Sequence, residues 1–230
     1  MTEFTKLWYL KQINLFKGLT KKELEYLNET TKMQEIPPKR TIYFLDDPAS
    51  TVYFLKKGKV KLVKVSPDGG EMILDVISAG EVFGELALID DGNREEIAMA
   101  IDDCLLCSIP KDKFIEIIEN HSRLNLKLMK LIGFRLRKFS SRLENLIFQD
   151  VRHRLFFLLQ DLIEKYGEKS KNEILIDCFL THREIGGLIA AQRQTVTSLM
   201  NDLKSEGIID FNRKKIVIRN PEMFYKQLTL

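Results

Sequence analysis

The sequence contains little cysteine and no long apolar segment. Its 230 residues include three cysteines, at positions 104, 107 and 178. An odd and sparse set of thiols argues against a disulfide framework and is typical of a reducing compartment. No apolar run approaches the roughly 20 residues that a membrane-spanning helix requires, and MTEFTKLWYLKQ at the start lacks the apolar core of a signal peptide. These absences predict a cytoplasmic chain that does not enter a membrane.

Metal ligands are also scarce. Cys104 and Cys107 form a C-x-x-C pair, but in a strand a separation of three residues directs two side chains to opposite faces. An iron–sulfur cluster needs more cysteines than the chain has. The three histidines, His121, His153 and His182, are scattered. We therefore expect buried structural thiols and no metal, haem or iron–sulfur cluster, with haem bound through a Cys or His as the alternative.

Charge is nearly balanced overall but unevenly distributed. The chain is 44% hydrophobic and 30% charged, as in a globular protein, with a net charge of +3. Residues 1–120 hold 16 Lys and Arg against 21 Asp and Glu, residues 121–150 hold 7 against 2, and residues 151–230 hold 13 against 10. An acidic first half before a basic second half favours a sensor joined to a polyanion-binding part. The modest excess over the last 80 residues does not by itself predict DNA binding.

Residues 39–110 are rich in short segments of branched and aromatic residues. Turn sequences such as Lys57-Gly58-Lys59 and Ala79-Gly80 separate these segments. Many short strands at even spacing predict an all-β barrel or sandwich. The predicted strands are Thr41–Leu45, Thr51–Leu55, Val60–Val65, Met72–Ile77, Ile97–Ile101 and Leu105–Ile109.

Residues 80–92, GEVFGELALIDDG, interrupt this strand pattern and are called the cassette below. Gly84 permits a positive φ or a close backbone approach. Glu85–Leu88 is compatible with a single helical turn, whose free N–H groups suit an anion or a sugar hydroxyl. The alternative is a tight connection without a ligand, which the spacing alone favours.

Helical patterns follow the predicted strands. Lys111–Asn120 predicts a short helix and Arg123–Ile147 a much longer one. On the long helix, apolar residues recur at separations of 3, 4, 3, 4 and 3, which is a coiled-coil seam and predicts a symmetric contact between two copies of the chain. A helix packed on its own domain is the alternative. The seam consists of Met129, Ile132, Leu136, Phe139, Leu143 and Leu146.

The next segment links the long helix to the C-terminal region. Asp150 is placed to cap a helix over Val151–Tyr166. Glu168–Asn172 predicts a polar loop, and Glu173–Cys178 a short strand.

Residues 180–207 predict two short helices joined by a tight turn. Thr181 and Glu184 form a capping box for the first helix, and the second has an apolar stripe with an opposite polar face. A helix-turn-helix presents the start of its second helix to base edges, which Arg, Gln and Thr can contact; an ordinary solvated helix face is the alternative. The candidate DNA-binding residues are Thr181, His182, Gln192, Arg193, Gln194, Thr195, Thr197 and Ser198.

A predicted hairpin follows the second of these helices. Ile208–Phe211 and Ile216–Ile218 predict strands around a basic turn. A hairpin with a cationic tip beside a recognition helix is typical of a winged helix, in which the tip contacts phosphates. The tip residues are Arg213, Lys214 and Lys215.

The order of these parts resembles the Crp/Fnr family of bacterial transcription regulators. The resemblance covers about residues 15–218 and rests on the cassette within a β domain and on RQTVTSLMNDLKSEGIID. It implies an α+β chain: an N-terminal β-roll, jelly-roll-like, that binds an effector (1–120), a long dimerisation helix (121–148) and a C-terminal winged helix-turn-helix domain (149–230). It also implies a homodimer on palindromic double-stranded DNA, with recognition helices about 34 Å apart, and contact with RNA polymerase.

Several residue roles follow from the resemblance alone. Arg193 matches the base-reading arginine of the family, whereas Gln194 and Ser198 stand where members often carry Glu and Arg, and Gln192 replaces a usual Ser. We therefore expect an altered half-site. The implied effector-binding residues are Phe83, Gly84, Glu85, Leu86, Ala87, Arg94, Ser140 and Ser141.

The effector itself is not identified by the sequence. Cyclic-AMP-binding members place an Arg-Ser phosphate anchor where this chain has Glu95-Glu96, with Arg94 one residue away. Two carboxylates repel a phosphodiester, and burial magnifies the penalty, so we expect a different effector or none. No catalytic constellation is present, and we expect a regulator rather than an enzyme. The alternative is a cyclic-nucleotide-binding module that regulates a protein partner or an enzyme.

Overall fold

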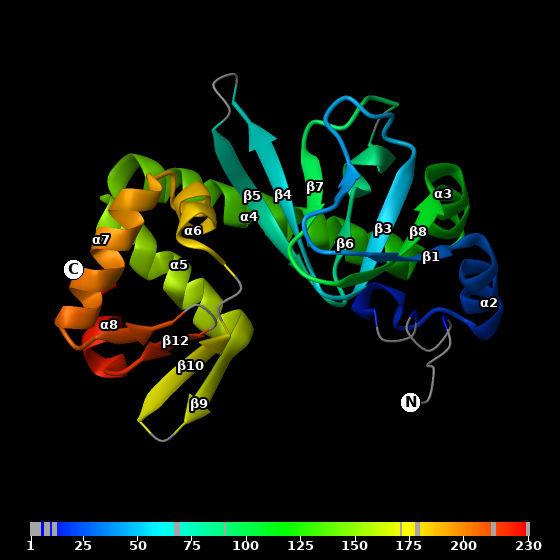
Figure 1. Cartoon of the computed structure of the whole chain (residues 1–230). Helices are drawn as coiled ribbons and strands as arrows, with labels where there is room; N and C mark the ends of the chain where they lie inside the picture. The colour runs from blue at the N-terminus through cyan, green and yellow to red at the C-terminus, as the bar shows by residue number, and fades with distance from the viewer. Residues whose placement is uncertain are drawn as a thin grey trace. The chain divides into compact units, whose positions relative to one another are not determined.

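The computed structural model describes residues 6, 10, 13–66, 70–89, 91–170, 172–177, 180–212 and 215–228. These residues form two compact units, 1–136 and 137–230, and each unit is described by itself. The boundary lies within a single helix, α4 (Ser122–Phe148), which is drawn in green in Figure 1. The predicted division at residues 120 and 148 therefore stays an interpretation.

Two four-stranded antiparallel sheets form the centre of the first unit (Figure 1). Their strand orders are β1-β8-β3-β6 and β2-β7-β4-β5. The strands are β1 (Lys32–Ile36), β2 (Thr41–Tyr43), β3 (Thr51–Lys57), β4 (Lys59–Val65), β5 (Glu71–Ser78), β6 (Val82–Phe83), β7 (Ile97–Ala100) and β8 (Cys104–Pro110). The predicted double-sheet β-roll is confirmed. β1 and β6 lie outside the predicted strands, because β1 is an edge strand with no buried residue and β6 has two residues.

Two apolar clusters stabilise this unit. One lies between the sheets and takes residues from both, among them Leu55, Val60 and Ile77. The other covers the outer face of the first sheet with α2 (Lys21–Thr30), α3 (Lys111–Glu119) and the start of α4. At its centre the rings of Phe16 and Phe54 meet edge to face at 4.8 Å, an arrangement that stabilises beyond the area buried.

The two described thiols belong to different clusters. Cys104 faces the cluster between the sheets and Cys107 the outer cluster, and both are free and buried. Burial, together with the carboxylate of Asp102, raises the pKa of Cys104 to about 11, which favours the protonated thiol over the nucleophilic thiolate. The prediction of buried structural thiols is confirmed for these two residues, whereas Cys178 lies outside the described residues.

The described part of the chain contains neither a candidate metal site nor a membrane-spanning helix. It holds no group of three or more His, Cys, Asp and Glu residues arranged to bind a metal ion. None of its helices combines the length and the apolar character needed to span a membrane.

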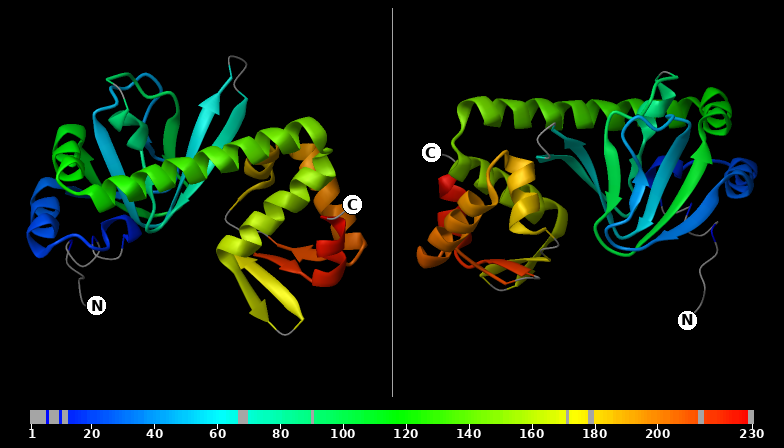
Figure 2. Two further views of the ribbon diagram at one scale, coloured as in Figure 1. Left: turned by 180° about the vertical axis from the view of Figure 1, so that it is seen from behind. Right: turned by 45° about the horizontal axis from the view of Figure 1, so that its top comes forward.

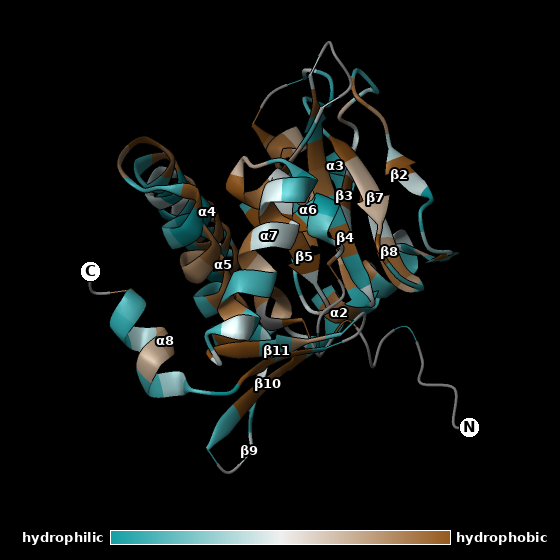
Figure 3. Ribbon diagram, turned by 60° about the vertical axis from the view of Figure 1, so that its left-hand side comes forward, coloured by the Kyte–Doolittle hydropathy of each residue, from teal (hydrophilic) through white to brown (hydrophobic). Residues whose placement is uncertain are grey.

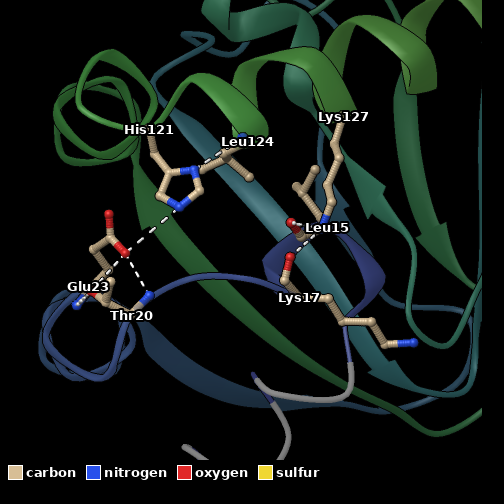
Figure 4. A network of polar contacts seen from close by, with 7 residues as sticks. All are labelled: Leu15, Lys17, Thr20, Glu23, His121, Leu124 and Lys127. Carbon is tan, nitrogen blue, oxygen red and sulfur yellow. Dashed lines mark hydrogen bonds and ion pairs between the residues drawn. The ribbon is translucent and has the colours of Figure 1, made fainter.

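The first turn of α4 is capped by His121 (Figure 4). The backbone N–H of Leu124 donates to Nδ1 of His121 at 3.2 Å, and Nε2 lies 3.8 Å from the carboxylate of Glu23. Glu23 closes the capping box of α2 by accepting the backbone N–H of Thr20 at 2.6 Å. This chain of contacts fixes the start of α4 against α2.

Further contacts hold the following turns of α4. Lys127 donates to the carbonyl oxygens of Leu15, at 3.3 Å, and of Lys17 (Figure 4). Leu124 and Leu128 are buried in the outer cluster. Beyond them α4 continues without interruption to Phe148, as the two views of Figure 2 show, and the predicted long helix is confirmed.

The second unit combines helices with one antiparallel sheet of order β11-β12-β10-β9. Asp150 caps α5 by accepting the N–H of His153 at 2.8 Å, as predicted, and Phe156 of α5 packs against Phe224 of α8. The helices are α5 (Val151–Tyr166), α6 (His182–Ile189), α7 (Arg193–Ser205) and α8 (Pro221–Gln227), and the strands are β9 (Gly167–Ser170), β10 (Glu173–Asp177), β11 (Ile209–Phe211) and β12 (Lys215–Ile218).

The predicted polar loop over Glu168–Asn172 is wrong for residues 168–170, which belong to β9. β9 pairs with β10, with Ser170 opposite Glu173. All four β9 residues are exposed, so the strand lacks the apolar alternation by which a sequence predicts strands. It forms because β10 would otherwise leave an edge of unpaired backbone groups.

Candidate nucleic-acid interface and effector site

A capping box and a tight turn define the helix-turn-helix. Thr181 and Glu184 make the predicted reciprocal contacts at the start of α6, including Thr181 N–H to the Glu184 carboxylate at 2.9 Å. At the other end Ala190 adopts left-handed φ 50° and ψ 55°, and Ala191 N–H donates to Gly186 O at 2.9 Å. A Cβ on Gly186 would lie 2.4 Å from Ala191 O. Only glycine therefore fits this close approach of α6 to the turn.

Helix α7 is amphipathic, as predicted. Val196, Met200 and Leu203 are buried, and hydrophilic bands mark its other face in Figure 3. Gln192 occupies the N-cap with extended backbone. Its side chain makes no hydrogen bond that caps the helix, and it can therefore contact DNA. The predicted contact residues with exposed side chains here are Thr181, Gln192, Arg193, Gln194, Thr195 and Ser198.

His182 and Thr197 are placed differently from the other candidates. Both are half-buried, and Nδ1 of His182 lies 2.9 Å from Oγ1 of Thr197. Oγ1 also donates to the carbonyl of Arg193, one turn earlier, at 2.9 Å. The Thr197 hydroxyl therefore joins α6 to α7 instead of standing free on the polar face. Burial and the charge of Arg193 lower the pKa of His182.

The predicted wing forms from β11 and β12, in which Phe211 pairs with Ile216. An ion pair of 2.6 Å joins Lys204 at the end of α7 to Asp210 in β11. Hydrogen bonds from Lys204 and from the Phe211 N–H lower the pKa of Asp210 to about 2. The wing is thereby fixed to the recognition helix. Lys215 is exposed, whereas positions 213 and 214 lie outside the described residues.

In the first unit the cassette contains the predicted helical turn. Gly84 has φ 69° and ψ 16° and leads into the 3₁₀ turn η2 (Glu85–Leu88). A Cβ at Gly84 would lie 2.9 Å from a guanidinium nitrogen of Arg94. Among the predicted effector residues, Phe83, Glu85, Ala87 and Arg94 are buried, whereas Leu86 is 47% exposed.

Arg94 points into the cassette. Its guanidinium donates to the carbonyls of Gly84, at 3.0 Å, and of Thr51. It lies over the ring of Tyr43, with Cζ 4.4 Å from the ring centroid, which adds a cation–π attraction. Its Nε is buried without a hydrogen-bond partner, an arrangement that is costly unless a ligand or water completes it.

The two carboxylates that follow Arg94 point in different directions. Glu96 is buried and accepts the Tyr43 hydroxyl at 2.8 Å. Burial raises the pKa of Tyr43, so this hydroxyl keeps its proton. Glu95 is exposed and lies 3.5 Å from Lys64. The expectation that both carboxylates face the site is therefore wrong: side chains at alternate positions turn inward, and these are Arg94 and Glu96.

A buried ion pair joins the cassette to α4. Arg135 contacts the Glu85 carboxylate and the carbonyl of Val82. Desolvation alone would lower the pKa of Arg135, but the Glu85 carboxylate outweighs it and raises that pKa. This contact was missed from the sequence because 50 residues separate its partners. The other effector candidates on α4, Ser140 and Ser141, are exposed in the second unit, and their role stays a prediction.

The predicted seam on α4 is mostly exposed within the chain. Side chains with 39–66% exposure are Met129, Leu136, Phe139, Leu143 and Leu146. Ile132 is half-buried. Monomeric proteins rarely expose so continuous an apolar stripe.

Comparisons with known proteins agree with both units. Residues 33–121 match a family model described as a cyclic nucleotide-binding domain, and residues 153–226 match a Crp-like helix-turn-helix domain. A global nitrogen regulator from Synechocystis sp. is 32% identical over 83% of this chain and 85% of its own. A CRP-like cAMP-activated global transcriptional regulator from Mycobacterium tuberculosis is 27% identical over 93% of this chain and 95% of its own. FixK2 from Bradyrhizobium japonicum has a similar fold, with a TM-score of 0.76, 21% identity, and coverage of 86% and 96%.

A cyclic-nucleotide-binding type of β-roll joined to a helix-turn-helix defines a class of DNA-binding transcription regulators. The chain belongs to the Crp/Fnr family of this class. Its relatives are regulators, which confirms the expectation of a DNA-binding regulator rather than an enzyme. They give no support to a module that acts on an enzyme or other protein partner.

Proposed function

We propose that two copies of the chain read a palindromic operator, each with its α7 in a major groove. The exposed polar face of α7 is the observation that supports this proposal. The capping box of α6 and the close turn at Gly186 hold α7 rigidly in place. Arg193 and Gln194 lie in the first turn, where a recognition helix contacts base edges. The wing residues Arg213, Lys214 and Lys215 then contact phosphates, which adds affinity without sequence information.

Dimerisation through α4 forms the second part of the proposal. The stripe from Met129 to Leu146 repeats at coiled-coil spacing and is mostly exposed within one chain. A parallel partner helix would bury it symmetrically and would supply the two-fold axis that a palindrome requires. Contact with RNA polymerase is expected from the family.

Replacing Arg193 by alanine tests the assignment of α7. We expect a loss of about 1–3 kcal/mol against a duplex selected by the wild-type protein, confined to one base pair in each half-site. The reason is that a bidentate contact to guanine is lost. Competition binding with single-base operator variants measures this. Arg183→Ala serves as the control, because it removes the same charge from an exposed position on α6.

An equal loss of affinity for operator and random duplexes would contradict a base-reading role and would indicate that Arg193 contacts a phosphate. Loss of base preference in the Arg183→Ala control instead would move the reading surface to α6.

We propose further that the effector is not cyclic AMP, although some relatives carry that ligand in their names. The buried Glu96 carboxylate accepts the hydroxyl of Tyr43, whose ring lies against Arg94, and a phosphodiester brought beside it meets like charge. Cyclic AMP should therefore leave the melting temperature unchanged, as measured by a ligand-concentration series. A melting temperature that rises with the concentration of cyclic AMP would contradict this and would indicate that Arg94 binds the phosphate.

A further inference from the structure

His182 lies where the two helices of the helix-turn-helix meet the wing. It begins α6 and contacts Thr197 of α7 at 2.9 Å. Its ring also packs against Phe211 of β11, with centroids 5.7 Å apart. A single half-buried imidazole therefore touches three elements of the proposed DNA-binding surface.

The hydroxyl of Thr197 decides which nitrogen of His182 carries the proton. A threonine hydroxyl has one proton to donate, and here it goes to the carbonyl of Arg193 at 2.9 Å. Nδ1 of His182 must then donate to Oγ1 of Thr197. The neutral ring consequently has its N–H on Nδ1 and a lone pair on Nε2. Protonation adds an N–H on Nε2 and leaves the contact with Thr197 intact.

We propose that His182, through Nε2–H of its protonated form, is a proton-dependent contact to the DNA phosphate backbone that strengthens operator binding as pH falls. Nδ1–H meanwhile positions α7 through Thr197. His182 stands at the start of α6, and backbone N–H groups at a helix N-terminus favour an anion. This inference rests on the proposed function, since it needs DNA at this face.

The charged groups around His182 favour this dependence. Arg193 of α7 lowers the pKa of His182 in the free protein, after burial, which is the larger cause. Lys204, near the end of α7, lies over the same Phe211 ring at 5.5 Å and pairs with Asp210 of β11. On its own helix the neighbouring charged residues are Arg183 and Glu184. Among the described residues, the only charge that shifts the pKa of His182 is that of Arg193, and together with burial it holds this pKa below its usual value in the free protein.

The sign of the effect follows from linkage. A phosphate beside Nε2 favours the charged form, so the pKa of His182 is higher in the complex than in the free protein. Binding therefore takes up a proton, and affinity rises as pH falls through the range of about 5 to 8 in which histidine titrates. Each unit of pKa increase is worth up to about tenfold in affinity per subunit, or about a hundredfold for two.

The test compares the pH dependence of binding among full-length variants. A duplex selected by the wild-type protein is titrated from pH 8 to pH 5.5 at constant ionic strength, with a random duplex in parallel. Wild type should tighten as pH falls on both duplexes, since a phosphate contact is independent of sequence. The affinity of His182→Gln should not change with pH. The affinity of His182→Arg, which carries a permanent cation, should be high and equally independent of pH. His153→Gln, on α5, is the matched control and should keep the wild-type slope.

Nuclear magnetic resonance gives a second measurement, which would not change on adding DNA if His182 had only a structural role. The titration midpoint of the His182 ring should rise when the duplex is added. A wild-type slope retained by His182→Gln, or a midpoint unchanged by DNA, would overturn the inference while leaving the proposed function standing. Absence of a preference for the selected duplex at any pH would overturn the proposed function and this inference with it.

Discussion

Replacing Arg135 by alanine is expected to lower the free energy of unfolding of the first unit by about 3–5 kcal/mol. The change leaves the Glu85 carboxylate, whose side chain is 6% exposed, without its cation in a buried site. Removing one partner of a buried pair costs more than the pair contributes, because the remaining charge stays desolvated. The shift in the urea midpoint of the first unit measures the effect.

Arg123→Ala is the matched control for this prediction, since Arg123 is an exposed arginine of the same helix. Its change should fall within about 0.5 kcal/mol of wild type. Glu85→Gln combined with Arg135→Ala should recover part of the lost free energy of unfolding, because it removes the unpaired carboxylate charge. Equal destabilisation by Arg123→Ala and Arg135→Ala would contradict the account of a buried ion pair.

Replacing Phe139 by aspartate is expected to convert the dimer into monomers. The change places two carboxylates opposite each other at the proposed two-fold axis. Like charges across an interface cost several kcal/mol, and about 4 kcal/mol is roughly a thousandfold in the dissociation constant. Sedimentation equilibrium measures the association.

Phe134 provides the control, because it is a 59% exposed phenylalanine on the same helix but lies off the seam. Phe134→Asp should remain dimeric. If Phe139→Asp also remained dimeric, the interface would have to lie elsewhere on the chain.

Elements with a strong repeating pattern were predictable from sequence. The long helix, the helix-turn-helix and most strands of the β-roll alternate apolar and polar residues at the period of their structure. The capping residues Asp150 and Thr181 marked helix starts because their side chains satisfy first-turn N–H groups. In contrast, β9 has no apolar face and forms only because β10 offers it a partner edge.

The candidate site was only partly predictable. Spacing placed Gly84 and Glu85 at a turn, but the Glu85–Arg135 pair depends on how α4 crosses the cassette within the first unit. The directions of Glu95 and Glu96 depended on which residue of the Arg94 loop turns inward. Thr197 was expected to face DNA, yet its hydroxyl is used between helices. Each of these outcomes is set by tertiary packing, which a local pattern does not contain.

A two-fold-symmetric dimer that reads a specific DNA sequence with α7, as we propose, protects DNA in a defined pattern. This pattern can be measured by footprinting the full-length protein on a duplex selected from a random library. We expect two protected major-groove segments related by two-fold symmetry, with centres about 34 Å apart, and a much weaker affinity for random duplexes. A single asymmetric footprint, or equal affinity for selected and random duplexes, would contradict the proposal.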